Sequence, residues 1–287
     1  MKQIILLILT LFFSTISEAK DLPAYVLYQS EGKKADIDKL MKAADSKHFI
    51  FFGELHNNPI SHWLQFELTK RLYALHKRRF VLGGEMFEAD NQFIIDEYLR
   101  DKITTKSFQS EVRLWPNYNT DYKPLLEFAK QKGVPFIASN IPRRYASMAY
   151  KQGLDSLKSL SDLAKSYIVP LNTFEFDSSL SCYNKMIHEF GEHGGYNIAL
   201  AQALKDATMA HFILKNVTNT SVFLHFNGAY HSDNYQGIVH YLKQKVDVEK
   251  ILTITTITQE DTDKLEEKHK GLADFIICVP ESMTTTH

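Results

Sequence analysis

The stretch between residues 48 and 62 passes from bulky apolar residues to a polar cluster within a few positions. Residues 48–52 are mostly aromatic or β-branched, which favours a buried strand. Gly53 ends that run, and Glu54 and His56 follow it at once. Pro59 stands where a helix would begin, because a first helical position does not need its N–H. The stretch therefore predicts a strand, a polar loop that carries an acid and an imidazole, and a helix.

Strand-like and helix-like patterns alternate along most of the chain. Bulky apolar runs that favour strands occur at residues 25–28, 48–52, 79–84, 134–139, 221–226, 250–257 and 274–279. Apolar residues at helical intervals predict helices at residues 37–44, 59–77, 91–100 and 122–132. Strands separated by helices imply parallel crossover connections. We therefore expect an α/β fold with a mainly parallel β-sheet flanked by helices, in which residues 25–28 form a short edge strand.

Residues 144–218 interrupt this alternation. They contain several helical patterns and no convincing strand, and Pro170 is the one clear helix breaker among them. A long helix around residues 198–215 leads back to the next strand. The sequence thus predicts an α/β sheet domain built from residues 20–143 and 219–287, with residues 144–218 inserted as a smaller all-helical subdomain.

Charge and cysteine content exclude several classes of protein. Lysine and arginine number 33, aspartate and glutamate 34, and the net charge is −1, so no nucleic-acid partner is expected. Two cysteines, Cys182 and Cys278, exclude a cysteine-only zinc site and a disulfide scaffold. Cys278 lies in an apolar run, which is typical of a buried and inert thiol. Export would permit the two cysteines to pair, and the sequence leaves that question open.

The first 19 residues have the pattern of a secretory signal peptide. Lys2 provides a positive start, residues 4–14 are mostly apolar, and Ser17 and Ala19 supply a small-x-small cleavage site. The apolar run is short for a membrane span, and an uncleaved membrane anchor is the alternative. No cysteine stands at the cleavage point, as a lipoprotein signal would require. We therefore expect residues 1–19 to be removed and the mature chain to be exported, periplasmic or secreted, and not a lipoprotein.

Polar side chains follow four of the predicted strands. The carboxyl ends of parallel strands meet at one edge of a sheet, so residues far apart in sequence can surround one pocket there. The four loops supply Glu54 and His56; Glu85 and Glu88; Asn140 and Arg143; and Asn227, Tyr230 and His231. This convergence is a stronger signal than any single loop.

Two acids and two histidines of this set suit two kinds of chemistry. Glu54, His56, Glu85 and His231 could perform general acid/base catalysis, because neighbouring carboxylates push one pKa upward. The same four side chains could instead hold a divalent metal ion. A third interpretation is that some of them only cap helices and tie loops together. His225 lies within a predicted strand, and we expect it to be a packed histidine.

The predicted helical subdomain also holds tyrosines and basic residues. Tyrosine usually fills cores or interfaces, although a phenolate can also ligate ferric haem iron. Lys151, Lys185 and His193 could then pair with the haem propionates. His188 and His193 do not form the zinc-binding helix of metalloproteases, because they are five residues apart rather than four.

Short motifs that follow one another in order cover nearly the whole mature chain. They lie at residues 53–59 (GELHNNP), 61–65 (SHWLQ), 85–87 (EMF), 91–92 (NQ), 115 (W), 122–124 (YKP), 138–143 (ASNIPR), 201–202 (AQ), 205–210 (KDATMA) and 227–231 (NGAYH). The ordered set resembles the ChaN-type haem-binding uptake proteins of bacteria, in a superfamily with the Tiki proteases and erythromycin esterases. The resemblance implies a parallel sheet flanked by helices and a small helical domain.

The resemblance also implies a ligand and a mode of assembly. In ChaN-type proteins two monomers enclose two face-to-face haems. A tyrosine of one monomer ligates each iron, and a histidine and a lysine of the other hold the propionates. Tyr150 and Tyr183 are the candidate ligands here, because both fall on helices of the inserted region, with Lys185 and His193 as candidate propionate partners. The expected partners are haem, a second copy in a haem-induced homodimer, and an outer-membrane haem receptor.

Two features of this chain differ from what a haem-binding role alone would predict. The characterised type is a lipoprotein, and this chain lacks the lipid-bearing cysteine. Esterases and proteases of the superfamily use acids and histidines in corresponding loops, which a haem role does not explain. We therefore expect an exported haem-binding protein for haem and iron uptake. The alternatives are a hydrolase of esters or peptides, with or without a metal, and a non-catalytic binding protein for another planar ligand.

The signal-peptide pattern predicts where the mature chain begins. Cleavage after Ala19 would leave Lys20 as the first residue, and N-terminal sequencing of the protein from its native host measures this directly. Membrane-embedded protein that still begins at Met1 would contradict the prediction.

Overall fold

One sheet runs through the computed structural model, which describes residues 22–286; the predicted signal peptide at residues 1–19 lies outside them. The strands of the described residues are β1 (Val26–Gln29), β2 (Lys34–Ala35), β3 (Phe49–Glu54), β4 (Phe80–Glu88), β5 (Phe136–Asn140), β6 (Val222–Gly228), β7 (Ile251–Gln259) and β8 (Phe275–Pro280). Their order across the sheet is β2-β1-β8-β7-β3-β6-β4-β5. The strands from β8 to β5 are parallel, and β1 is antiparallel to both of its neighbours.

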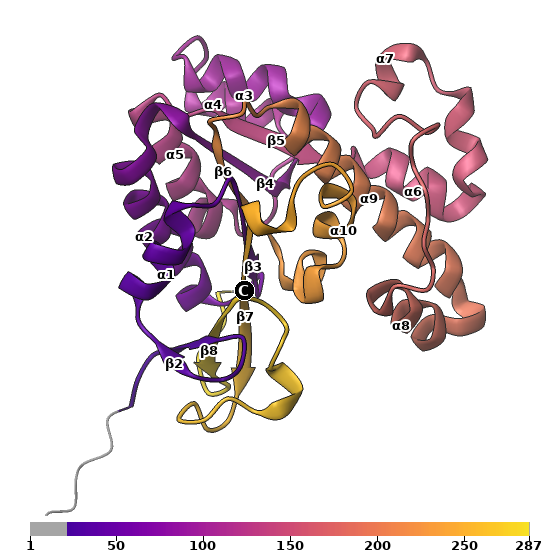
Figure 1. Cartoon of the computed structure of the whole chain (residues 1–287). Coiled ribbons are helices and arrows are strands. Elements are labelled where there is room, and N and C mark those ends of the chain that lie inside the picture. The colour runs from indigo at the N-terminus through magenta and orange to yellow at the C-terminus, as the bar shows by residue number, and fades with distance from the viewer. Residues whose placement is uncertain (1–21, 287) are drawn as a thin grey trace, which may run out of the picture.

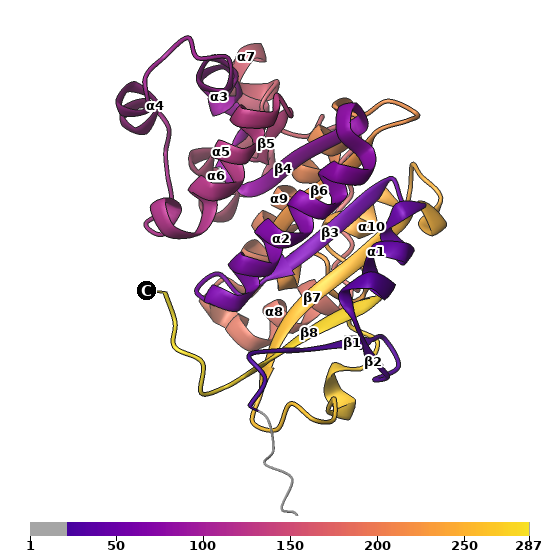
Figure 2. The same ribbon diagram turned by 90° about the vertical axis from the view of Figure 1, so that its left-hand side faces the viewer.

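Helices lie on both faces of this sheet, as the two views in Figures 1 and 2 show. The α-helices of the described residues are α1 (Ile37–Asp45), α2 (Pro59–His76), α3 (Gln92–Leu99), α4 (Thr105–Glu111), α5 (Lys123–Lys132), α6 (Arg143–Gln152), α7 (Asp162–Lys165), α8 (Ser181–Phe190), α9 (Gly195–Lys215) and α10 (Ile238–Leu242). Pro59 is the first residue of α2, where the sequence predicts it, and the Asn58 side chain caps that helix by accepting from the Ser61 amide. The predicted α/β fold is confirmed.

The predicted strand ends were wrong in one consistent way. The seven predicted strands correspond to β1 and to β3 through β8, whereas the two-residue β2 was not predicted. Where polar loops were expected, β3 continues to Glu54 and β4 continues through Glu85 to Glu88. Glu54 stays in the ladder because strand pairing uses backbone groups, and it remains in register with Gly228 of β6. β4 shifts its register between Gly84 and Glu88, so Glu85 lies in an irregular stretch before Glu88 pairs with Asn140 of β5.

The strand order brings the polar strand ends together. β6 lies between β3 and β4, with Gly53 of β3 opposite Asn227 and Gly84 of β4 opposite Phe226. Glu54 and Glu85 therefore follow these pairs on opposite sides of the end of β6. The crossover connections of the sheet bring these two acids together, although they are far from β6 in sequence.

Alternate residues of each central strand enter separate hydrophobic layers. In β3, Ile50 and Phe52 pack with the core under α1, α2, α3 and α5, whereas Phe49 and Phe51 pack with residues of α6, α8, α9 and α10. All four side chains are buried. Burial of each such side chain stabilises the fold by about 1.5–3 kcal/mol. A shift of a central strand by one residue would move these side chains to the opposite faces of the sheet and cost much of that stability.

Residues 144–218 form only helices and loops among the described residues, as their sequence pattern predicts. In Figure 1, α6 and α7 lie above α8 on the same side of the sheet, and α9 runs from α8 back toward the sheet. Buried residues of α9 share one hydrophobic cluster with Phe49 and Phe51 of β3. The division of the chain into a sheet domain and a helical subdomain stays a prediction.

Both cysteines are buried and free, so they do not pair in this structure. Cys278 is buried, as predicted, and burial raises its pKa to about 12, which disfavours the reactive thiolate. Within residues 22–286, no helix combines the length and the apolar composition that a membrane span requires.

Candidate functional site

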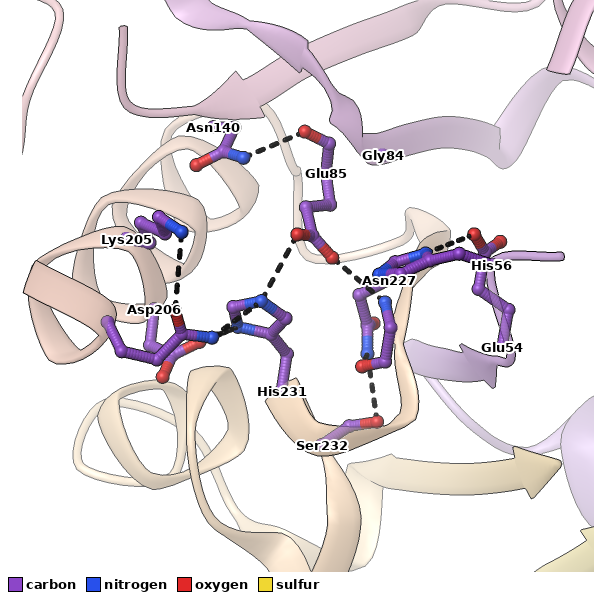
Figure 3. A network of polar contacts seen from close by, with 12 residues as sticks. Glu54, His56, Gly84, Glu85, Asn140, Lys205, Asp206, Asn227, His231 and Ser232 are labelled. Atoms are coloured by element: carbon purple, nitrogen blue, oxygen red, sulfur yellow. Dashed lines mark hydrogen bonds and ion pairs between the residues drawn. The ribbon is translucent and has the colours of Figure 1, made fainter. Parts of the chain in front are cut away.

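The carboxyl ends of β3, β4 and β6 border a cavity of about 710 Å³, which we call the strand-end cavity. Helix α9 and a 3₁₀ turn after β6 (Ala229–His231) contribute to its other side. Figure 3 shows the polar side chains here gathered toward one another. Those that line the cavity include Glu54, His56, Glu85, Gln202, Lys205 and His231. The two acids and two histidines singled out in the sequence thus lie around one space.

Two glycines allow the backbone to approach closely enough to form this cavity. A Cβ at Gly53 would lie only 2.9 Å from the Cα of Ala229, so β3 can contact the 3₁₀ turn only without a side chain there. A Cβ at Gly228 would lie 2.8 Å from His56 Nε2 and 3.6 Å from Glu85 Oε2. The imidazole of His56 and the carboxylate of Glu85 therefore border the same small space next to Gly228.

Glu54 orients His56. The Nδ1 of His56 lies 2.9 Å from Oε1 of Glu54, so the ring presents its other nitrogen to the cavity. The Tyr122 hydroxyl donates to Glu54 Oε1 at 2.6 Å, and the Gln65 amide donates to Glu54 Oε2. Burial lowers the pKa of His56, but the hydrogen bond that the ring donates to Glu54 and the charge of Glu85 leave that pKa above 6.5. His56 can therefore act as a general base whose orientation is fixed by the Glu54 carboxylate.

His231 lies between two carboxylates in the interior of the site. Its Nε2 is 3.2 Å from Glu85 Oε1, and its Nδ1 contacts Asp206 Oδ1. Glu85 Oε2 also accepts the backbone N–H of Gly228 at 2.8 Å. Asp206 lies on α9 and accepts the Tyr183 hydroxyl of α8 at 2.7 Å. One buried network therefore joins β4, the turn after β6, α9 and α8.

The charges of this network follow from its geometry. Burial by itself lowers the pKa of His231, but the carboxylates of Glu85 and Asp206 raise it to about 10. Burial opposes ionisation of Glu85, and His231 together with His56 holds the pKa of Glu85 well below its usual range. Burial keeps the pKa of Asp206 above its ordinary value even though His231 opposes this. At neutral pH His231 is therefore an imidazolium, and its main ionised partner is the carboxylate of Glu85.

The other predicted strand-end residues lie in three places. Tyr230 lines the strand-end cavity, and its hydroxyl donates to the carbonyl of Cys182. Asn227 is buried and fixes the turn, because its amide donates to Ser232 Oγ at 3.0 Å and to the Gly228 carbonyl at 2.9 Å. Glu88, Asn140 and Arg143 line a neighbouring cavity on the other side of Glu85 instead.

Sequence reasoning missed several residues of the site. Asp206, Gln202 and Lys205 come from α9, and Tyr122 and Gln65 support Glu54. All five lie within motifs that carried the family resemblance, but none follows a strand. A polar residue on an otherwise apolar helical stretch, such as Asp206 among alanines and leucines, is the signal that would have found the α9 residues.

The prediction of a divalent metal at this site finds no support. No group of three or more His, Cys, Asp or Glu side chains within residues 22–286 is arranged to hold a metal ion. The physical reason is visible in the network: His231 is already held by Glu85 and Asp206, and the Nδ1 of His56 faces Glu54. These pairings satisfy the groups that a metal would need.

The four residues predicted to hold haem do not share one environment. Tyr183 is fully buried and its hydroxyl donates to Asp206, so in this structure it is closed to any ligand. Tyr150 is 37% exposed, and its hydroxyl lies beside Gly194, the residue that follows His193. Lys185 on α8 and His193 in the 3₁₀ turn Gly191–His193 are both exposed.

His225 is a packed histidine, as predicted. It is buried in β6, with Nε2 2.8 Å from Ser139 Oγ and Nδ1 3.1 Å from Asn227 Oδ1. Burial lowers its pKa to about 4, so it is neutral at pH 7. Two buried histidines near the same strand ends therefore carry different charges.

These pKa shifts predict how stability depends on pH. Because the pKa of His231 rises from 6.5 to about 10 on folding, its contribution is complete below pH 6.5 and is lost as the pH rises through 10. Between these limits the free energy of unfolding should fall by up to about 1.4 kcal/mol per pH unit from this group. The His231→Gln variant should lack that slope, as urea denaturation at a series of pH values would show.

The His225→Gln variant is the matched control. The lowered pKa of His225 costs stability only as the pH falls below 6.5 toward 4, so this variant should differ from the parent on the acid side. Identical alkaline slopes for the parent and His231→Gln would contradict the charge assignment.

Comparison with known proteins relates this fold to others. ChaN of Campylobacter jejuni, whose structure is described as cofacial haem binding, matches with a TM-score of 0.64 and 15% identity over 88% of this chain and 96% of that one. A succinoglycan biosynthesis protein matches with a TM-score of 0.51 and 12% identity over 85% of this chain and 90% of that one. At such identities these likenesses show a shared fold alone.

Comparison of the amino-acid sequence identifies one relative and a protein family. The chain is 23% identical over 266 residues to Protein RETICULATA-RELATED 5, chloroplastic, of Arabidopsis thaliana. That alignment covers 85% of this chain and 35% of the plant protein, so the chain spans about a third of its relative's length. The family described as haem-binding uptake, Tiki superfamily, ChaN matches residues 40–242, which include β3 through β6 and every residue of the buried network. On that match, the chain belongs to the ChaN-type haem-binding uptake family of the Tiki superfamily.

Proposed function

We propose that this chain is an exported haem-binding protein that takes part in haem and iron uptake and dimerises around its ligand. The observation that carries the proposal is the open position of Tyr150, since Tyr183 is closed by burial and by its bond to Asp206. Membership of the ChaN family supports it, and ChaN of Campylobacter jejuni is described as binding haem cofacially. An outer-membrane haem receptor is the partner we propose for transfer.

Two exposed aromatic residues flank, along the chain, the turn that lies beside Tyr150. Phe190 ends α8 and Tyr196 lies in the first turn of α9, on either side of the 3₁₀ turn against which Tyr150 packs. Tyr150, Phe190 and Tyr196 are 37%, 41% and 56% exposed, and we call these three residues the aromatic patch. A flat, largely apolar ligand such as haem would remove this surface from water.

The chemistry at the patch fits a haem. A tyrosine phenolate ligates ferric haem iron in known proteins, and the group would supply a metal centre for that oxygen. Lys185 lies on α8 and His193 in the turn between Phe190 and Tyr196; both are exposed, and neither side chain has a hydrogen bond or ion pair with another described residue. They are therefore free to pair with propionates. Two copies that face each other across two haems would bury both aromatic patches, which favours a ligand-dependent dimer.

An absorption titration with hemin tests the role of Tyr150. The parent should give the spectrum of a ferric tyrosinate complex, and Tyr150→Phe should lose it because the phenolate oxygen is gone. Tyr145→Phe is the matched control on the same helix: the Tyr145 hydroxyl accepts from Arg144 and should leave the spectrum unchanged. Sedimentation velocity should show a shift from monomer to dimer only when hemin is present.

Two outcomes of that experiment would reject the proposal. One is a parent spectrum like that of free hemin, with no hemin-dependent dimer. The other is a tyrosinate spectrum that survives Tyr150→Phe and is lost in Tyr183→Phe, which would require Tyr183 to leave its buried position beside Asp206.

A hydrolase is the second candidate function, and the geometry of His56 favours it. Glu54 holds the Nδ1 of this ring, and the Nε2 lies next to Gly228 at the cavity. A base oriented in this way can take a proton from water that attacks an ester or a peptide.

His56→Gln tests this candidate with little cost to the fold, because the His56 side chain is 44% exposed. If the chain hydrolyses nitrophenyl esters or peptides, the variant should lose at least about a hundredfold in rate with an unchanged melting temperature. His240→Gln, a histidine on α10 outside the strand-end cavity, should retain full activity. A parent that is silent toward both substrate classes would remove the hydrolase candidate.

A further inference from the structure

A second cavity, of about 570 Å³, lies on the other side of Glu85 from the strand-end cavity. We call it the arginine-side cavity, and define it by Glu85, Glu88, Trp115, Asn140, Arg143 and Lys205. Glu85 and Lys205 line both cavities, so the two spaces adjoin at these side chains. Nothing in the haem proposal uses this cavity, since the aromatic patch lies elsewhere.

The charges at the arginine-side cavity do not balance within the chain. Glu85 is paired with His231 and with the Gly228 amide, and Glu88 lies 3.6 Å from Arg113. The guanidinium of Arg143 has no hydrogen bond or ion pair with another described residue. Lys205 contacts only the neutral Gln202 amide, at 3.3 Å. Two cations therefore border this space without an anionic partner from the described chain.

Helix α6 adds to this positive potential. Its first residue is Arg143, and its N-cap, Pro142, provides no side-chain acceptor for the amides of the first turn. The Glu88 carboxylate accepts one of these amides, the backbone N–H of Arg143, and so offsets part of the positive end of this ten-residue helix dipole, which lies beside the two cations. Together these features make the cavity attractive to an anion.

A buried acceptor without a donor points to the kind of anion. Asn140 is 91% buried; its Nδ2 donates to the Glu85 carbonyl at 2.9 Å, and its buried Oδ1 has no hydrogen-bond partner among the described residues. The carbonyl of Glu85 can only accept, so the amide cannot be reversed to relieve Oδ1. Figure 3 shows Oδ1 turned away from Glu85, on the side where Lys205 lies. A ligand that supplies an O–H here would satisfy it.

We propose that the arginine-side cavity binds the oxyanion of a small molecule that also carries an O–H donor, as a singly protonated phosphate group does. Arg143 and Lys205 bind the anionic oxygens, and Asn140 Oδ1 accepts the remaining proton. Trp115 supplies an apolar wall for the rest of the molecule. The site is separate from the haem site, and it requires no chemistry at the bound group.

Calorimetric titration of the mature chain with inorganic phosphate at pH 7 tests this proposal. Phosphate keeps a proton at this pH and should bind saturably at one site, whereas sulfate has the same shape without a donor and should bind at least about tenfold more weakly. Arg143→Gln and Lys205→Gln should each weaken phosphate binding by about tenfold or more. 2-Hydroxyisobutyrate carries a carboxylate and an O–H at this pH, and it tests whether a hydroxy acid can replace phosphate.

Arg144→Gln is the matched control. Arg144 is the next residue of α6, but its guanidinium is held by Asp90 at 2.5 Å and by the Tyr145 hydroxyl at 3.2 Å, away from the cavity. It should bind phosphate like the parent, and all three variants should melt like the parent. Equal affinity for sulfate and phosphate would overturn the role of Asn140.

Three further outcomes separate this proposal from the haem proposal. An absence of saturable phosphate binding, or an equal loss in Arg144→Gln, would overturn the site. Displacement of phosphate by hemin would assign Arg143 and Lys205 to propionates and would overturn the separate ligand. A normal hemin spectrum in Arg143→Gln, combined with normal phosphate binding in Tyr150→Phe, would support two independent sites.

Discussion

The imidazolium of His231, held between Glu85 and Asp206, is the interaction on which the arrangement of this site depends. Each of the three groups is buried, and each would be costly to bury without the others. Because they come from the turn after β6, from β4 and from α9, their mutual attraction fixes three elements that are distant in sequence. Removal of one partner would leave an uncompensated charge in the interior, which typically costs about 3–5 kcal/mol.

The same network links the sheet to the helical segment. Tyr183 donates to Asp206, so α8 is tied to the charge cluster through its one fully buried tyrosine. The hydrogen bond places the phenol inward and leaves Tyr150, near the end of α6, as the open tyrosine. Helical periodicity could not distinguish these two residues, because both lie on amphipathic helices and only the tertiary partner Asp206 decides which hydroxyl is buried. The choice between these two candidate tyrosines was therefore beyond sequence reasoning.

The fold was predictable because its signal is local. Phe49 through Phe52 enter two hydrophobic layers in alternation, and Pro59 and Asn58 begin α2 by their own chemistry. The strand ends were less predictable, because the ladder continues past the last apolar residue wherever a neighbouring backbone is present, as at Glu54 and, beyond a register shift, at Glu88. The acids and histidines that follow strands were found, since topology alone brings strand ends together. Asp206 was not, because a helix residue carries no such positional signal.

Helix α6 relates the two ligands that we propose. Arg143 begins the helix and Tyr150 lies two turns later, so the two residues are about 10 Å apart along its axis. An oxyanion at the first turn meets the positive end of the helix dipole, while the iron bound to a phenolate near the last turn would place a metal cation at the negative end. Both ligands would therefore be stabilised by the same helix, with opposite charges at opposite ends.

Glu85, which belongs to β4, keeps the oxyanion from the His231 imidazolium, because its own carboxylate already neutralises that charge. The oxyanion is thus directed to Arg143 and Lys205, the two cations beside it that no described carboxylate holds.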